Sequence, residues 1–150
     1  MRRKEREIKD QKEIENILKA CSVCRLAMVD GDKPYLVPMN FGYRDGALYL
    51  HSAREGKKIE LIKKNPEICF EADEIVRFRK AKLACDWGVE YKSVIGSGKA
   101  VFLTGPEEKR RAFDIIMAQY SDEAFDYSDN MLEKTLVIKI EIETMTGKKS

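Results

Sequence analysis

Residues 23–52 read VCRLAMVDGDKPYLVPMNFGYRDGALYLHS, and this stretch decides the class of fold. It holds three apolar runs with the composition of β-strands, separated by the turn signals Asp30-Gly31-Asp32 and Arg44-Asp45-Gly46. Short turns between strand-like runs predict an antiparallel meander. Pro38 cannot donate a ladder hydrogen bond, so the backbone from Pro38 to Asn40 is expected at an edge, at a bulge or facing a ligand.

A short helix is predicted after the meander, over residues 57–64, and Asn65-Pro66 ends it. Lys57 and Lys58 stand at its start, where the helix dipole disfavours a cation by roughly 0.3–1 kcal/mol. Gly56 lets the backbone approach a ligand, and free N–H groups beside two ammonium groups suit a phosphate. The alternative is that both lysines belong to a solvated face, in a chain that is 36% charged.

The flanking segments add further elements. A charged leader over residues 1–12 is expected to be exposed and to run into an amphipathic helix with Ile14, Ile17, Leu18 and Cys21 on one face. Strands are predicted over residues 68–72 and 91–103, and Gly96 and Gly98 in the second of them indicate a bulge or a close approach.

The last third of the chain predicts one helix and one strand. Thr104 and Glu107 have the spacing of a capping box, and the apolar residues that follow would pack this helix on the sheet. The run TLVIKIEIETM, residues 135–145, alternates as a half-buried strand does, and a short polar tail follows.

About six or seven mostly antiparallel strands, with two or three helices and no βαβ rhythm, predict an α+β protein built on a barrel or a strongly curled sheet. The length of 150 residues fits one domain, residues 1–150, with a single functional site.

The charge balance excludes several classes of partner. The chain has 28 basic and 26 acidic residues, a formal net charge of +2, so neither a nucleic-acid footprint nor affinity for an anionic membrane is indicated. The charged amino terminus lacks the apolar core of a signal peptide, and no segment is long and apolar enough to span a membrane. We expect a cytoplasmic protein that binds small molecules or other proteins.

Four cysteines, Cys21, Cys24, Cys69 and Cys85, are expected to be thiols in a reducing compartment. The Cys21-x-x-Cys24 spacing raises zinc or redox chemistry, but no second close pair accompanies it, so no metal site is expected. Cys24 and Cys69 lie in strand-like runs, where cysteine usually packs as a small hydrophobic residue.

His51 is the only histidine, and it ends a predicted strand. A hydrolase would need a base beside its nucleophile, and neither a Gly-x-Ser-x-Gly elbow nor a dinucleotide fingerprint is present. An imidazole can transfer a proton or hydrogen-bond a ligand, so His51 is a candidate catalytic residue. A structural histidine at a strand end is the alternative.

Two segments together resemble a known family. Residues 24–71, CRLAMVDGDKPYLVPMNFGYRDGALYLHSAREGKKIELIKKNPEICFE, and residues 84–103, ACDWGVEYKSVIGSGKAVFL, resemble the flavin-binding core of the pyridoxamine 5'-phosphate oxidase-like split barrels. More narrowly, they resemble the branch that contains the 5-nitroimidazole-resistance nitroreductases. The resemblance implies a homodimer of split β-barrels with FMN in a cleft between the subunits.

The resemblance also implies a set of cofactor contacts. The FMN phosphate would lie near Gly56, Lys57 and Lys58, the isoalloxazine along Pro38, Met39 and Asn40, and the ring and ribityl chain near His51 and Ser52. The other subunit would contribute Tyr91, Lys92, Ser93 and Val94. Ordinary cross-strand packing is the alternative for Tyr91 and Val94. Trp87 is either a lid over the flavin or an anchor in the core or the dimer interface.

The activity implied is an FMN-dependent reduction of nitroimidazole-like or other small electron-accepting substrates, with electrons from a nicotinamide donor or another reductant. His51 would donate a proton or position the nitro group. The sequence ends in MTGKKS after the last strand, without the arginine- and histidine-bearing segment of true pyridoxamine phosphate oxidases, so vitamin B6 oxidation is not expected. Alternatives are a non-catalytic flavin-binding protein and a haem- or deazaflavin-binding relative.

Overall fold

The computed structural model describes residues 3–150, so the first two residues of the charged leader lie outside the described part. Eight strands form one antiparallel sheet in the order β3-β2-β6-β7-β8-β5-β4, and β1 pairs with β8. The strands are β1 (Glu7–Ile8), β2 (Cys24–Asp30), β3 (Lys33–Met39), β4 (Gly42–Arg44), β5 (Ala47–Ser52), β6 (Glu67–Arg79), β7 (Gly88–Leu103) and β8 (Leu136–Lys149). The α-helices are α1 (Gln11–Ala20), α2 (Lys57–Lys64), α3 (Pro106–Met117) and α4 (Asp129–Lys134), with 3-10 turns at Lys4–Arg6 and Ala84–Asp86.

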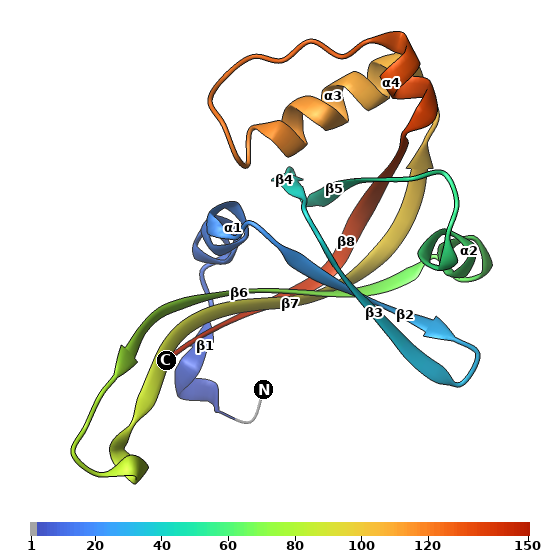
Figure 1. Cartoon of the computed structure of the whole chain (residues 1–150). Coiled ribbons are helices and arrows are strands. Elements are labelled where there is room, and N and C mark those ends of the chain that lie inside the picture. The colour runs from blue at the N-terminus through green and yellow to red at the C-terminus, as the bar shows by residue number, and fades with distance from the viewer. Residues whose placement is uncertain (1–2) are drawn as a thin grey trace.

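The two ends of the sheet, β3 and β4, are consecutive in the chain and are joined at Asn40 and Phe41. The sheet therefore curls until both edges approach this joint, which gives the split barrel in Figure 1. The interior is filled by fully buried side chains from both halves of the sheet, among them Leu26, Phe70 and Ile140. The predicted α+β split barrel is confirmed.

A second, smaller core lies under the helical excursion between β7 and β8, seen at the top of Figure 1. Phe113 and Ile116 of α3 pack with Leu132 of α4 and Val137 of β8. This packing fixes α3 beside β4 and β5, the strand pair that leads to His51.

The bulge predicted at the glycines of β7 is confirmed, because the β7–β8 register shifts between Ser97 and Gly98. A Cβ at Gly96 would lie 2.4 Å from Phe70 Cζ, and one at Gly98 would lie 2.1 Å from the Glu141 carbonyl oxygen. Both contacts are too short for any side chain, so the close approach of β7 to its neighbours requires glycine at these two positions.

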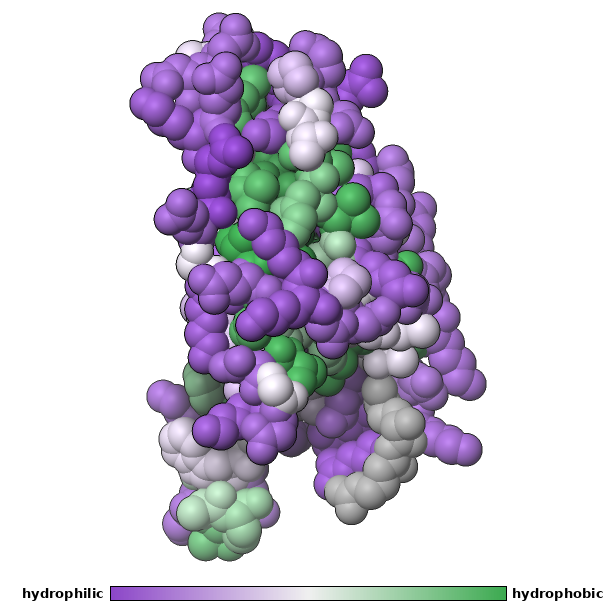
Figure 2. Space-filling model, turned by 90° about the vertical axis from the view of Figure 1, so that its right-hand side faces the viewer, coloured by the Kyte–Doolittle hydropathy of each residue, from purple (hydrophilic) through white to green (hydrophobic). Residues whose placement is uncertain are grey.

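Beyond the barrel, β6 and β7 continue as a two-stranded arm that extends to the lower left of Figure 1. Its apolar side chains face solvent: Phe78 is 58% exposed, Leu83 61% and Trp87 51%. Figure 2 shows hydrophobic side chains at the lower end of the molecule, at the height of the turn of this arm. No other element within residues 3–150 covers these side chains.

Several sequence predictions were wrong in detail. The predicted meander is instead two hairpins, β2-β3 and β4-β5, at opposite ends of the sheet, because the chain leaves β3 at Asn40 and turns into the separate strand β4. The leader is not wholly exposed, since Ile8 pairs with Gly147 and is buried in the barrel core. The predicted polar tail is the end of β8, which runs to Lys149 and pairs with β7.

The helices also differ from the prediction. Gly105, rather than Thr104, precedes the first turn of α3, and its N–H donates to Glu108 Oε2 at 3.3 Å, one residue beyond the predicted Glu107. Helix α4 was not predicted, which brings the α-helices to four. No helix in residues 3–150 has the length and apolar composition to cross a membrane.

Candidate functional site

The connection between β5 and α2 carries the first part of the candidate site. Ser52, the last residue of β5, is only 8% exposed, and its hydroxyl has no hydrogen-bond partner among the described residues. Four residues later, Gly56 adopts φ 125°, a conformation that side chains oppose, and caps the start of α2. A buried orphan hydroxyl costs free energy, and the first N–H groups of a helix lack helical partners, so this short segment has unused donors for a bound group.

Lys57 already has an anionic partner. Its ammonium lies 2.7 Å from Asp30 Oδ2 at the end of β2, and 4.9 Å from the centre of the Tyr35 ring. The hydrogen bond from Lys57 lowers the pKa of Asp30, and the same bond raises the pKa of Lys57, so the pair is fully charged at neutral pH. Lys58 follows it in α2 and is half-buried, and it forms no ion pair with any residue in the described chain.

Pro38 and Met39 end β3, which is an edge strand of the sheet, as the proline predicted, and Asn40 follows in the joint to β4. The side chains of Pro38 and Asn40 are exposed, whereas Met39 packs partly against the barrel core. The Asn40 amide donates to the Ser22 carbonyl at 3.2 Å. The backbone of this segment therefore has no strand partner on one side within the described chain, and pairing with β2 and the Asn40 hydrogen bond hold it on the other.

His51 lies beside Ser52 in β5, opposite Val137 of β8, and its side chain is exposed. Its ring centroid is 5.7 Å from that of Phe113, at a tilt of 41°, and Phe113 in turn packs on Tyr127 at 5.2 Å. An exposed imidazole held against an aromatic ring can present a proton to a ligand. Sequence reasoning missed Phe113 as its support because the two residues are joined only by the packing of α3 on β5.

Tyr91, Lys92, Ser93 and Val94 lie in β7 near the base of the arm, away from His51 within the same chain. His51 is opposite Val137, and Val137 is opposite Leu103 of β7, nine residues beyond Val94. Nine residues of strand span about 30 Å. One copy of the chain therefore does not bring these β7 residues to the β5 end of the candidate site.

The β7 residues also differ in their accessibility. Tyr91, Lys92 and Ser93 are half-buried, but Val94 is fully buried in the barrel core. The Val94 side chain packs in the barrel core, as the packing alternative expects, and a contact of this segment with a cofactor bound by another subunit stays a prediction. Trp87 is not a core residue: it is 51% exposed, and its indole N–H donates to the Ala81 carbonyl at 2.8 Å.

Two cations, Lys148 and Arg6, lie near Tyr91, and the sequence alone did not predict either contact. Lys148 Nζ lies 5.5 Å from the centre of the Tyr91 ring. The pKa of Tyr91 is lowered, first by its hydrogen bond with Lys148 and also by Arg6. The pairing of β1 and β8 with each other, and of β8 with β7, brings these three distant residues together.

The Cys21-x-x-Cys24 pair is part of the barrel core. Both thiols are buried. Burial raises the pKa of Cys21 to about 11, helped by the charge of Glu74, and burial raises that of Cys24 to about 12. Because the thiolate rather than the thiol is the nucleophile, both residues are poorly reactive in the folded chain.

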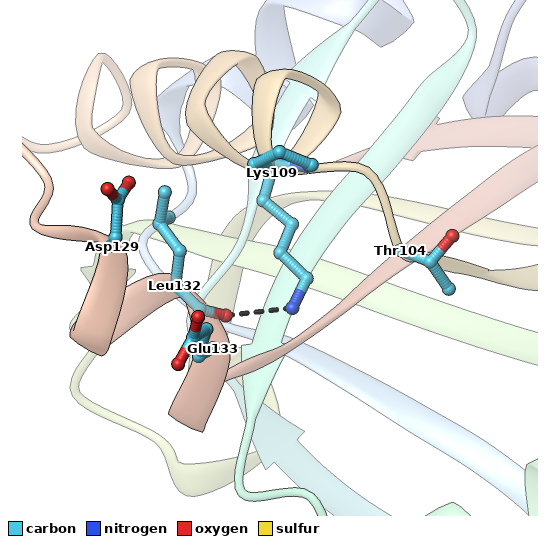
Figure 3. A pocket seen from close by; sticks show the side chains of 6 residues that line it. Thr104, Lys109, Asp129, Leu132 and Glu133 are labelled. Carbon is cyan, nitrogen blue, oxygen red and sulfur yellow. Dashed lines mark hydrogen bonds between the residues drawn. The ribbon is translucent and has the colours of Figure 1, made fainter.

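Figure 3 shows a pocket of about 350 Å³ between α3 and α4 that is separate from all of these residues. Lys109 points across it and donates to the carbonyls of Leu132 at 2.8 Å and Thr135 at 2.9 Å. Arg54 donates to the neighbouring Glu133 carbonyl at 2.7 Å. The two cations thus satisfy the carboxyl end of α4.

Comparison with known proteins gives a consistent result. The family model described as pyridoxamine 5'-phosphate oxidase matches residues 10–149. The structure is similar to that of a candidate 5-nitroimidazole antibiotic resistance protein from Bacteroides thetaiotaomicron, with 37% sequence identity and a TM-score of 0.86 over 95% of this chain and 86% of that chain. It is also similar to a FAD-binding protein from Mesorhizobium loti, with 26% identity and a TM-score of 0.72 over 97% of each chain.

Two further relatives are more distant. A flavocytochrome from Azotobacter vinelandii has a TM-score of 0.86 over 100% of this chain and 72% of that chain, and its 17% identity supports only the shared fold. An uncharacterised protein from Rhizobium meliloti is 26% identical over 92 residues, which cover 61% of this chain and 54% of that protein. The match thus spans about half the length of this curated relative.

Proposed function

The chain belongs to the pyridoxamine 5'-phosphate oxidase family, and from that membership we propose that it is an FMN-dependent oxidoreductase that reduces nitroimidazole-like or other small electron-accepting molecules. The relative with 37% identity is a candidate nitroimidazole resistance protein, which supports this class of substrate.

The observation that carries the proposal is the orphan hydroxyl of Ser52 beside the start of α2. The hydroxyl is buried and unpaired, Gly56 leaves space because nothing lies within 4 Å of where its Cβ would be, and Lys58 has no carboxylate partner among the described residues. A phosphate supplies several acceptor oxygens and negative charge, which is the complement of these groups. The residues present therefore fit the phosphate end of FMN.

The remaining candidate residues would orient the flavin and the substrate. The open edge of β3 would offer the backbone near Pro38, Met39 and Asn40 to a planar ring, and the exposed His51 lies on β5, beside the other edge strand, β4. When bound, the flavin would supply the redox chemistry, taking electrons from a nicotinamide or another reductant. His51 would hold the substrate by a hydrogen bond or donate a proton to it.

A second copy of the chain is part of the proposal. The separation of about 30 Å between Val94 and Leu103 along β7 keeps Tyr91, Lys92 and Ser93 from the β5 end of their own barrel. The outer face of the sheet exposes Leu36 at 58% and Ile95 at 53%, and the apolar arm continues from it. A homodimer that covers these groups would bring β7 of one protomer to the FMN of the other.

The test is an anaerobic assay of the FMN-loaded protein with NADH, NADPH or dithionite as reductant and metronidazole as acceptor. We expect the bound FMN to be reduced and then reoxidised by metronidazole with stoichiometric reduction of the nitro group. Binding of FMN without reoxidation by metronidazole or other nitroaromatics would support a non-catalytic flavoprotein, and preferential binding of haem would support the haem-binding alternative. Sedimentation should give about twice the mass of the 17.3 kDa chain.

A further inference from the structure

Tyr120, three residues beyond the end of α3, forms hydrogen bonds with two segments that are far away in the sequence. Its phenol oxygen lies 2.7 Å from the Ser22 carbonyl, 2.9 Å from the Phe41 amide nitrogen and 3.0 Å from the Phe41 carbonyl. A phenol has one proton, so it donates to one carbonyl at a time while it accepts from the Phe41 N–H. Asn40, between these segments, donates to the same Ser22 carbonyl.

We propose that Tyr120 is a positioning residue for the Pro38–Asn40 segment, through its hydroxyl; this inference rests on the proposed flavin site. The ladder partners of β3 end at the pair of Cys24 and Met39, and the next two residues make the joint to β4. Without a ladder, the path of the chain at Asn40 depends on the bonds that Tyr120 and Asn40 make to Ser22 and Phe41.

The hydroxyl, rather than the ring, is the part of Tyr120 that does this. The residue is 40% exposed, so its ring contributes little to either core, whereas the Phe41 it binds is fully buried. Loss of the hydroxyl would leave the Phe41 N–H without its partner and free the joint between the two edges of the sheet. Substitution by phenylalanine removes this single atom and keeps the ring.

The neighbouring Gln119 provides a matched control. Its amide donates to the carbonyls of Leu18 at 2.8 Å, Lys19 at 3.1 Å and Cys21 at 2.7 Å, which satisfies the carboxyl end of α1. Gln119 therefore connects the segment after α3 to the end of α1, but it forms no hydrogen bond with Phe41 or Asn40. A change at Gln119 tests for a general loss of stability.

The experiment compares Tyr120→Phe and Gln119→Ala with the unaltered chain in two measurements. Hydrogen exchange of the FMN-free protein measures the mobility of the joint directly. We expect the Phe41 amide to exchange about tenfold faster in Tyr120→Phe than in the unaltered chain. In Gln119→Ala, its exchange rate should change only as far as the overall stability of the protein changes. Titration with FMN should show binding about three- to tenfold weaker in Tyr120→Phe, with a changed absorbance spectrum of the bound flavin, and unchanged in Gln119→Ala.

The outcomes distinguish a failure of the inference about Tyr120 from a failure of the proposed function. Faster exchange together with weaker or spectrally altered FMN binding in Tyr120→Phe alone supports the inference. Equal exchange at Phe41, or equal FMN affinity and spectrum, in Tyr120→Phe and the unaltered chain overturns it. Failure of the unaltered chain to bind FMN refutes the proposed function, and Tyr120 then positions no flavin contact, whatever the exchange of Phe41 shows.

Discussion

The ammonium of Lys57 donates to the carboxylate of Asp30 at 2.7 Å, and this pair joins the start of α2 to the end of β2. The first cation of the predicted phosphate site is thus balanced by a protein carboxylate before any ligand binds. Both groups are more than a third exposed, so the pair contributes little to the stability of the fold. Its effect on the proposed site is larger, because Asp30 would repel a phosphate bound there and restrains Lys57.

Substitution of Asp30 by asparagine should tighten the binding of FMN. The change removes a negative charge beside the proposed phosphate site and frees Lys57, and we expect about a two- to fivefold lower Kd, with a larger effect at low salt. Fluorescence titration with FMN measures it. The control is Asp32→Asn in the same turn, which removes equal charge without touching Lys57; equal tightening in both variants would show a general charge effect only.

Substitution of Lys58 by alanine should weaken FMN retention, because the phosphate loses a charge-assisted contact that typically contributes about 1.5–3 kcal/mol. The matched control is Lys63→Ala in the last turn of α2, which removes the same charge from a residue that is not among the charges acting on Asp30. Both Kd values come from the same titration. An affinity for FMN in Lys58→Ala equal to that of the control would remove Lys58 from the site.

Replacement of His51 by alanine should leave the fold intact, since the side chain is exposed, but should lower kcat for metronidazole reduction by about tenfold or more. Steady-state kinetics and the absorbance of the bound flavin measure the effect. Wild-type kinetics and an unchanged spectrum would make His51 a structural residue at the end of β5.

Replacement of Gly98 by alanine should destabilise the barrel by about 1–3 kcal/mol, because the new methyl group would meet the backbone of β8 at Glu141. Chemical denaturation measures the loss. Ser97→Ala, at the same bulge, gives up only an exposed hydrogen bond to Thr144 and should change the free energy of unfolding by about 0.5 kcal/mol or less. Equal effects of the two substitutions would contradict the close packing at the bulge.

The buried thiols predict protection and a pH dependence. At pH 8, Cys21 and Cys24 should react with a thiol reagent only after unfolding. Because burial raises the pKa of each thiol from its ordinary value of 9.0, the unfolded chain loses these protons first, so stability should fall as the pH rises from 9 towards 11. Rapid labelling of the native protein at either residue, identified by peptide mapping, would contradict their poor reactivity.

Much of the barrel could be predicted because its strands carry local signals. The turns at Asp30 and Asp45, the alternation in β8 and the proline of the edge strand β3 are all contained within a few neighbouring residues. Helix α4 was missed because it has only six residues in a polar segment, although Ser128 is a normal cap that accepts from the Met131 N–H at 3.3 Å.

The site was less predictable, because its supports are long-range contacts. The bond from Tyr120 to Phe41 spans 79 residues, and the ion pair of Lys57 with Asp30 depends on the packing of α2 on β2. The arm gave no clear strand pattern because its two strands leave apolar side chains such as Phe78 in solvent, so the usual alternation with a buried face is absent. Spacing in the sequence contains none of this information.

The most direct measurement is a visible absorbance scan of freshly purified protein, followed by heat release of any chromophore and its identification by mass. We predict a flavin spectrum and the release of FMN. A colourless protein that also fails to bind added FMN would contradict the central claim, and Lys57 and Lys58 would then be an ordinary solvated pair at the start of α2.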